Sequence, residues 1–217
     1  MRLSALIISS ILFIGSAVAQ PTPDLAPEAD EPQVNDLETL LPESDSDIGP
    51  REVVRENAQA ELETLFEKLA SAESPTSANP IAYKIQRIWL DSGSDAVDLL
   101  MDRAADAMAA NQLALALDLL DHVVTLRPEF AEGWNRRATI FYMQEDYGRS
   151  LSDIERVLAL EPRHWGALSG LAIIQRRLGD DKRALETFRS ALAIHPGLEA
   201  SREAMEKLEK AAAGVAI

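Results

Sequence analysis

The chain has 217 residues, a formal net charge of −15 and no cysteine. Its length and its 47% hydrophobic residues allow a sizeable core, whereas the lack of cysteine excludes disulfides, thiolate metal sites and a cysteine nucleophile. The acidic balance argues against a nucleic-acid partner, because affinity for nucleic acid depends on Lys and Arg contacts to phosphate.

The first 19 residues are typical of a cleaved signal peptide. Arg2 precedes an apolar run over residues 3–18, and Ala17-Val18-Ala19 fits the small-residue cleavage pattern, so we expect cleavage after Ala19. An uncleaved anchor is the alternative, but the run is short against the roughly 20 residues of a membrane span. This segment predicts a periplasmic or secreted protein, and the lack of cysteine suits a bacterial periplasm. No later stretch approaches a span, so we expect no integral span in the mature chain.

Residues 20–50 predict an acidic, proline-rich, disordered linker. They hold nine Asp or Glu, six of the eleven prolines and no Lys or Arg, so charge repulsion and missing backbone donors prevent a packed core. Within them, residues 34–41 carry apolar residues at helical spacing and could fold on a partner or dock back on the domain. With this segment and Arg2 removed, residues 51–217 carry 27 acids and 20 bases, so the extreme charge lies in the tail.

Three prolines reveal an internal repeat. Pro128, Pro162 and Pro196 are 34 residues apart, and each follows an apolar helical pattern. Because proline disfavours helix at the preceding residue, each predicts a helix end. Alignment on these prolines gives repeat units 97–130, 131–164 and 165–198.

Small and large residues recur in the same register. Small residues would let paired helices approach closely, and large apolar residues would fill the gaps between them. The small positions are Ala104, Ala138 and Ala172, then Ala116, Ser150 and Ala184; the large ones are Leu100, Trp134 and Leu168, then Leu120, Ile154 and Phe188.

This pattern resembles the tetratricopeptide repeat (TPR) family. The second unit matches it most fully, with Trp134, Ala138, Tyr147 and Pro162 at family positions. The resemblance implies an all-α solenoid of antiparallel helix pairs. Together with the predicted signal peptide, it suggests a family member of the exported bacterial type.

Residues 51–96 predict a degenerate repeat in front of these three units. Phe66, Leu69 and Ala82 align with repeat positions, and Asn79-Pro80 would supply an N-cap and a first-turn proline for its second helix. At the other end, residues 199–217 predict a polar-faced capping helix and a tail, since a solenoid must shield its open end.

The resemblance implies that first helices line a concave face that binds extended or helical peptide segments of other proteins. Methionine would supply adaptable apolar contact and asparagine would bond a peptide backbone. The family's inward positions give the candidate peptide-binding residues Met101, Met108, Asn135, Thr139, Tyr142, Met143, Ser169, Ile173, Arg176 and Arg177. Only Asn135 and Arg136 are similar to the carboxylate clamp of part of the family, which does not favour a reader of C-terminal carboxylates.

Catalysis, cofactors and metals are not expected. The three histidines have no paired ligand spacing, and no nucleophile motif is present. His164 and His195 lie near predicted helix ends, where a cation would complement the helix dipole. Trp165 is either a partly exposed contact residue or a packing residue between units.

Several residues are predicted to be structural. Trp134 is expected in the core, and Pro128, Pro162 and Pro196 at helix ends. Arg137 stands where many repeats carry an apolar residue, and a buried arginine requires a partner. Asp153, sixteen residues on, would lie opposite Arg137 in an antiparallel hairpin, so we expect an ion pair.

The sequence therefore predicts a non-catalytic, exported scaffold or adaptor that binds peptide segments of envelope proteins. Two alternatives remain: a periplasmic chaperone or assembly factor, and an accessory regulator of an envelope hydrolase or uptake system.

Overall fold

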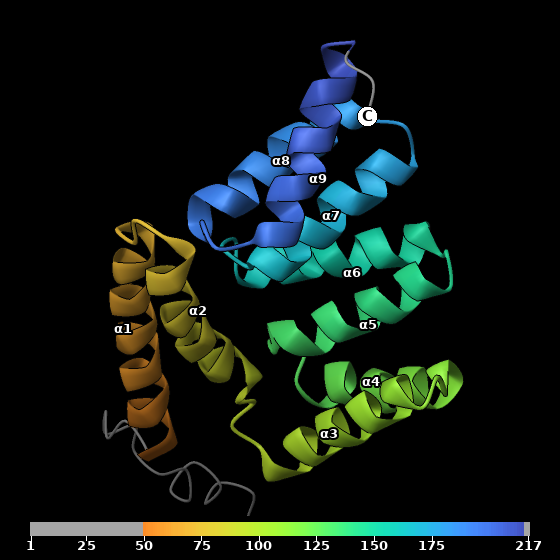
Figure 1. Ribbon diagram of the computed structural model, residues 1–217. Helices are drawn as coiled ribbons and strands as arrows, with labels where there is room; N and C mark the ends of the chain where they lie inside the picture. The colour runs from red at the N-terminus through yellow and green to blue at the C-terminus, as the bar shows by residue number, and fades with distance from the viewer. Residues whose placement is uncertain (1–49, 215–217) are drawn as a thin grey trace, which may run out of the picture. The chain divides into compact units, whose positions relative to one another are not determined.

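The computed structural model describes residues 50–214, with side chains from residue 57 onward. The predicted signal peptide 1–19 and the predicted linker 20–50, except for Pro50, lie outside the described residues. Residues 50–214 form helices joined by short turns, without a strand (Figure 1), which confirms the predicted all-α class. The helices are α1 (Pro50–Ala70), α2 (Pro75–Leu90), α3 (Asp95–Ala109), α4 (Leu113–Leu126), α5 (Ala131–Met143), α6 (Tyr147–Leu160), α7 (Trp165–Arg177), α8 (Asp181–Ile194) and α9 (Glu199–Ala212).

Three antiparallel pairs, α3/α4, α5/α6 and α7/α8, follow the 34-residue period and pack on one another in sequence. Helices α5 and α7 begin at Ala131 and Trp165, the first residues of two predicted units. Each second helix ends two residues before a repeat proline. The six small residues of the repeat are all buried, because each lies where the helices approach most closely.

The turn inside each pair contains one residue in the left-handed region of backbone space. Asn111, Glu145 and Gly179 have φ values of 56°, 60° and 82° and occupy the same repeat position. Glycine adopts this region without cost and asparagine tolerates it, but glutamate pays a steric penalty. The second unit therefore holds a strained residue where the third holds a glycine.

Glu145→Gly should raise the free energy of unfolding by about 1 kcal/mol, because it removes this strain. Gly179→Ala is the matched control and should lower stability by about the same amount at the equivalent position. Chemical denaturation of both variants measures the two effects. A Glu145→Gly variant less stable than the parent would show that the glutamate side chain makes a contact that outweighs its strain.

Trp134 is half-buried, so its prediction as a core residue is wrong. Its counterparts Leu100 and Leu168 are also only half-buried. The indole N–H donates to the carbonyl of Pro128 at 3.0 Å, and the Arg137 guanidinium lies 4.7 Å from the ring centre. The ring thus covers the edge of the core, where its polar N–H finds a partner.

The N-terminal hairpin α1/α2 does not continue the stack as a fourth repeat. Its two helices pack together, with α1 against α8 and α2 against α5. Figure 1 shows the hairpin beside the stack, at the ends where α5 and α7 begin. Its apolar side chains form one cluster with Trp165 of α7; the buried members are Leu62, Leu65, Phe66, Leu69, Ala78, Ala82, Ile85 and Trp165.

The start of α2 also differs from the prediction, because Asn79-Pro80 is not its N-cap and first turn. Ser74 is the N-cap and exchanges hydrogen bonds with Ser77 in a capping box, Pro75 occupies the first turn, and Pro80 lies inside the helix. Both prolines fit the general rule for helix starts, so the sequence alone did not separate them.

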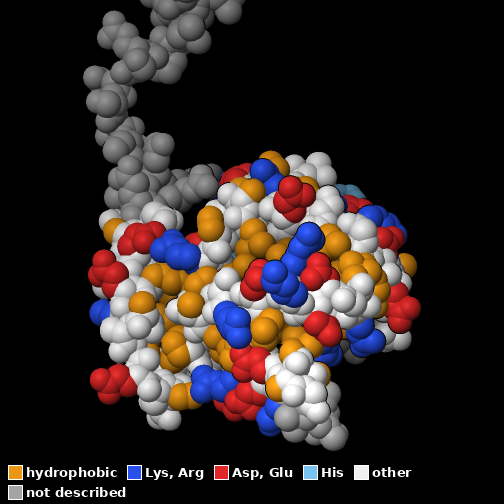
Figure 2. Space-filling model, turned by 90° about the horizontal axis from the view of Figure 1, so that it is seen from above, with side chains coloured by type: hydrophobic (Ala, Val, Ile, Leu, Met, Phe, Trp, Pro, Cys, Tyr) orange, Lys and Arg blue, Asp and Glu red, His pale blue; other side chains and the backbone are white. Residues whose placement is uncertain are grey.

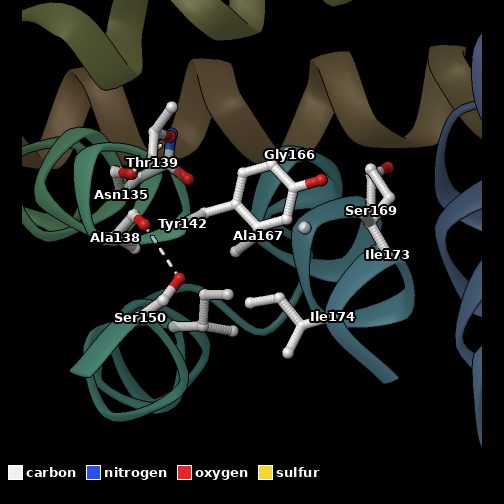
Figure 3. Close-up of a pocket in the computed structure, with 12 residues that line it drawn as sticks. Asn135, Ala138, Thr139, Tyr142, Ser150, Gly166, Ala167, Ser169, Ile173 and Ile174 are labelled. Carbon is white, nitrogen blue, oxygen red and sulfur yellow. Dashed lines mark hydrogen bonds between the residues drawn. The ribbon is translucent and has the colours of Figure 1, made fainter. Parts of the chain in front are cut away.

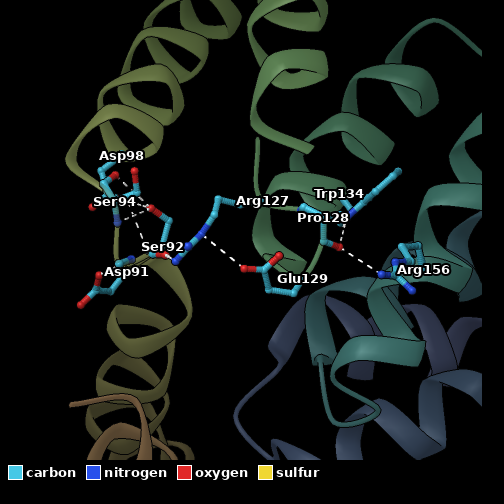
Figure 4. A network of polar contacts seen from close by, with 10 residues as sticks. Asp91, Ser92, Ser94, Asp98, Arg127, Pro128, Glu129, Trp134 and Arg156 are labelled. Carbon is cyan, nitrogen blue, oxygen red and sulfur yellow. Dashed lines mark hydrogen bonds and ion pairs between the residues drawn. The ribbon is translucent and has the colours of Figure 1, made fainter. Parts of the chain in front are cut away.

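The connection from α2 to α3 is tied to the stack by polar contacts (Figure 4). Arg127 donates to the carbonyl oxygen of Ser92 at 2.6 Å, and Asp98 accepts from the Ser92 hydroxyl at 2.5 Å. Gly93 has a φ of 69°, and a Cβ there would lie 3.2 Å from the Arg127 guanidinium. These contacts hold the connection between the hairpin α1/α2 and the first helix of the stack, α3, in place.

Helix α9 begins 34 residues after Trp165, so it takes the place of the first helix of a further unit. It packs on α8, and Ser201 is its one buried residue among those described. The outer face of α9 is polar, as expected for a capping helix. Across residues 50–214, no helix combines the length and apolar character that a membrane span requires.

Candidate functional site

A cavity of about 280 Å³ opens between α5, α6 and α7. Half of the predicted peptide-binding residues line it, all at inward repeat positions: Asn135, Thr139, Tyr142, Ser169 and Ile173. Figure 3 shows the Tyr142 ring reaching from α5 across toward α7. The structure thus brings together residues of two successive first helices.

The floor of the pocket is apolar. Ala138, Ile154, Ala167 and Ile174 form it, and all four are buried. Ser150 also lies there, but its hydroxyl donates to the Ala138 carbonyl at 2.8 Å, so it presents no unsatisfied donor to a ligand. The floor therefore favours an apolar group.

The polar side chains at the rim are held by bonds within the protein. Asn135 donates from its amide nitrogen to Glu132 at 3.0 Å, and the Thr139 hydroxyl donates to the Asn135 carbonyl at 3.0 Å. The Ser169 hydroxyl lies 2.7 Å from the Trp165 carbonyl and 3.0 Å from the Ser201 hydroxyl. These bonds orient the rim before any ligand arrives.

Arg177, which is exposed, lies one helical turn beyond Ile173, a residue of the pocket lining, on the same face of α7. A side-chain hydrogen bond with the Tyr142 phenol raises the pKa of Arg177, and the negative charge of Glu145 acts in the same direction. Arg176 is half-buried in the same last turn of α7. On the face shown in Figure 2, Lys and Arg are interspersed with Asp and Glu, so that face carries charges of both signs.

The three candidate methionines are not equivalent. Met101 is only 3% exposed and packs in the core around α3 and α4, so it is not available to a ligand and its prediction is wrong. The small Ala104 and Ala107 beside it leave space that its flexible chain fills. Met108 is half-buried against the same core, and Met143 is exposed.

Sequence reasoning missed the residues of the pocket floor. Gly166 and Gly170 both line the cavity, and the side-chain volume missing at Gly170 helps to explain why it opens in this unit. The same repeat position carries Asp102 in the first unit and Arg136 in the second. A Cβ at Gly170 would lie 3.6 Å from the Ile154 side chain, an ordinary contact distance. A comparison of repeat positions for missing side-chain volume would have pointed to this place.

His164 is the N-cap of α7, so the expectation of a cation complementing a helix dipole is wrong for this residue. Its Nδ1 accepts the backbone N–H of Ala167 at 3.1 Å, and its Nε2 lies 3.2 Å from Glu132. A positive ring at a helix N-terminus would oppose the dipole. Burial acts to raise the pKa of Glu132, but the hydrogen bond with His164 and the charge of Arg136 hold the pKa below its ordinary value.

His195 caps the C-terminal end of α8 and is buried against Trp165, with ring centres 5.1 Å apart. Burial lowers the pKa of His195 below its ordinary value of 6.5, because a charged ring would lose its hydration.

His195 should therefore make the fold less stable as the pH falls below 6.5. In that range the unfolded chain binds the proton more readily than the folded chain, so stability decreases with decreasing pH. His195→Asn should flatten the dependence of the unfolding free energy on pH between 6.5 and the carboxylate range near 4.5. His122→Asn, at an exposed histidine, is the control. If the unfolding free energy of the parent and of His195→Asn changes equally with pH in this range, His195 is not the source of the pH dependence.

No group of three or more His, Asp or Glu side chains within the described part of the chain is arranged to hold a metal ion.

These features define a repeat solenoid with a ligand-sized pocket on the inward positions of its first helices. Residues 142–199 match the tetratricopeptide repeat family. A TPR repeat-containing protein of Rhizobium etli is 41% identical over 153 residues, which cover 70% of this chain and 75% of that protein. The chain therefore belongs to the TPR family, whose domains typically bind proteins or peptides and are usually non-catalytic.

Solved structures support the same fold. The first TPR domain of Spaghetti (RPAP3), bound to an HSP90 peptide, aligns with a TM-score of 0.52 at 17% identity, covering 55% of this chain and 95% of that chain. The OM64 TPR domain of Arabidopsis also gives 0.52 at 19% identity, over 54% of this chain and 97% of that chain. The Sgt2 TPR domain from Aspergillus fumigatus gives 0.52 at 20% identity, over 55% and 80% of the two chains.

Proposed function

We propose that this protein is a non-catalytic scaffold or adaptor that binds peptide segments of other proteins in the pocket between α5, α6 and α7. The observation that carries the proposal is the position of the pocket. It opens at the inward repeat positions of two successive first helices, and its floor is apolar. The structure of the RPAP3 TPR domain with an HSP90 peptide supports it by analogy of fold.

Export to the bacterial envelope is the second element of the proposal. It rests on the apolar run 3–18 and the Ala17-Val18-Ala19 pattern. If export occurs as proposed, the mature protein begins at Gln20. Intact-mass measurement of protein from the envelope fraction tests this, and retention of residues 1–19 would make the protein an anchored one.

A site-specific crosslinking experiment tests the binding function. A photoreactive amino acid at Thr139, an exposed residue at the pocket rim, should give adducts with defined proteins in the native envelope. The same probe at Glu155, which is exposed on α6 and does not line the pocket, is the matched control. Equal adducts from both positions would count against the pocket as the binding site.

The apolar floor also favours one alternative, a chaperone or assembly factor, because such a floor accepts many clients. Adducts with many unfolded or outer-membrane proteins, in place of one or a few, would select that alternative. A changed activity of an envelope hydrolase on addition of this protein would select the accessory-regulator hypothesis.

A further inference from the structure

We infer that the pocket recognises an internal peptide segment with one large apolar side chain as anchor and a carboxylate side chain nearby that meets Arg177. This inference rests on the proposed function and specifies its ligand. The anchor, the charge and the internal position each follow from a different observation.

The size and floor of the pocket specify the anchor. A volume of about 280 Å³ is just below the range of about 300–1,000 Å³ that is typical of pockets for whole small molecules. A single Leu, Met or Phe side chain is a suitable occupant for such a space. Ala138, Ile154 and Ile174 would contact it, and the hydroxyl of Ser150 is already satisfied by the backbone. A polar anchor would lose its hydration there without gaining a partner.

The charge beside the pocket specifies the second element. Arg177 is exposed and follows Ile173, which lines the pocket, by four residues in α7, so it lies one turn further along the same face of that helix. Glu145, in the turn between α5 and α6, acts on Arg177 through its charge and not through a hydrogen bond, so it neutralises the guanidinium only in part. A peptide whose anchor enters the pocket would pass Tyr142, and an acidic residue close to the anchor would then meet the guanidinium.

The contacts of Asn135 and Arg136 point to an internal segment rather than a chain terminus. These are the two residues similar to a carboxylate clamp, but both are engaged within the protein. Asn135 donates to Glu132, and Arg136 donates to Glu132 at 3.4 Å and to the Met101 carbonyl at 3.2 Å. Glu132, in the first turn of α5, would also repel a terminal carboxylate that approached Asn135 and Arg136. The carboxylate that binds should therefore belong to a side chain near Arg177.

Short fluorescent peptides on a Gly/Ser background, each with one Leu and one nearby Glu, test the inference by anisotropy. Replacing Leu with Ala should weaken binding by about tenfold or more, because most of a buried side chain is lost. Replacing Glu with Gln should weaken binding by several-fold at low salt and less at high salt. Amidation of the peptide C-terminus should leave the affinity unchanged. A large loss of affinity on amidation would overturn the inference that an internal segment binds.

Two protein variants locate the contacts. Gly170→Leu should fill the pocket and abolish the preference for Leu over Ala, while the melting temperature stays at or above that of the parent, because leucine replaces a helical glycine. Arg177→Glu should remove the preference for Glu over Gln. The control Lys182→Glu/Arg183→Glu reverses two charges on exposed residues of α8 outside the pocket lining and should leave both preferences intact.

The outcomes separate this inference from the proposed function. Equal binding of Leu and Ala peptides, no binding of any peptide, or an unchanged Leu preference in Gly170→Leu overturns the inference. If Thr139 still gives specific crosslinks in the envelope, the binding function stands with a ligand of different chemistry. If the probe at Thr139 gives the same adducts as the control probe at Glu155, the proposed peptide-binding function of the pocket is overturned as well.

Discussion

Arg137→Leu should lower the free energy of unfolding by about 3–5 kcal/mol, since it leaves a buried carboxylate without its partner. Arg137 donates to both oxygens of Asp153, at 2.8 and 2.7 Å, and Asp153 is only 4% exposed. The predicted pair is thus present as a two-point interaction inside the second unit. The hydrogen bonds to Asp153 raise the pKa of Arg137 above its ordinary value even though burial opposes this.

The opposite single change should be less harmful. In Asp153→Thr, the arginine keeps a second partner, because Asp121 of the preceding unit accepts from it at 2.8 Å. Asp121 is exposed, so this remaining pair contributes at most about 1 kcal/mol, but it lets the guanidinium stay charged and solvated. Chemical denaturation should therefore rank Arg137→Leu below Asp153→Thr in stability.

The third unit supplies the design for a rescue. Leu171 and Thr187 occupy the places of Arg137 and Asp153, and the Thr187 hydroxyl donates to Gln175 at 2.8 Å. The double variant Arg137→Leu/Asp153→Thr should recover most of the loss, because no charge is left buried. Recovery should be incomplete, since Phe141 stands where the third unit has Gln175. A coupling energy near zero in this double-mutant cycle would show that the pair does not stabilise the fold.

The repeat stack was predictable because the same pattern of small and large residues recurs every 34 positions. Ala138 and Ser150 must be small for the same geometric reason in every unit, so three copies of the pattern reinforce one another. The Arg137–Asp153 pair followed from the same register, because an apolar position that carries a charge requires a partner in the facing helix.

The remaining features depend on residues that occur once. The hairpin α1/α2 packs beside the stack because Phe66 of α1 and Trp89 of α2 contact Trp165 of α7, with ring centres 6.2 and 4.4 Å away. No repeat position predicts these contacts.

The pocket opens where side chains are missing at Gly166 and Gly170. Met101 is buried because the small residues Ala104 and Ala107 beside it leave space for its side chain. Inward repeat positions therefore predicted where ligands could bind, but not which of these side chains remain accessible.

Trp165→Ala should destabilise the protein by about 3–5 kcal/mol and release the hairpin from the stack. Trp165 is 3% exposed, and its ring centre lies 4.4 Å from that of Trp89, 6.2 Å from Phe66 and 5.1 Å from His195. It is the point at which the apolar cluster of the hairpin joins α7, so its loss removes contacts that no neighbouring side chain can replace.

Trp134→Ala is the matched control, and it should cost clearly less, about 1–2 kcal/mol, because a half-buried ring loses less contact. Hydrogen exchange distinguishes local release from global unfolding. In Trp165→Ala, the backbone amides of Leu62 and Leu69 in α1 should lose protection before those of Ile140 in α5. If the amides of α1 and α5 lose protection together, the hairpin and the stack form one cooperative unit. If Trp134→Ala is the more damaging change, the rim of the second unit, and not the joint with the hairpin, limits the stability of the fold.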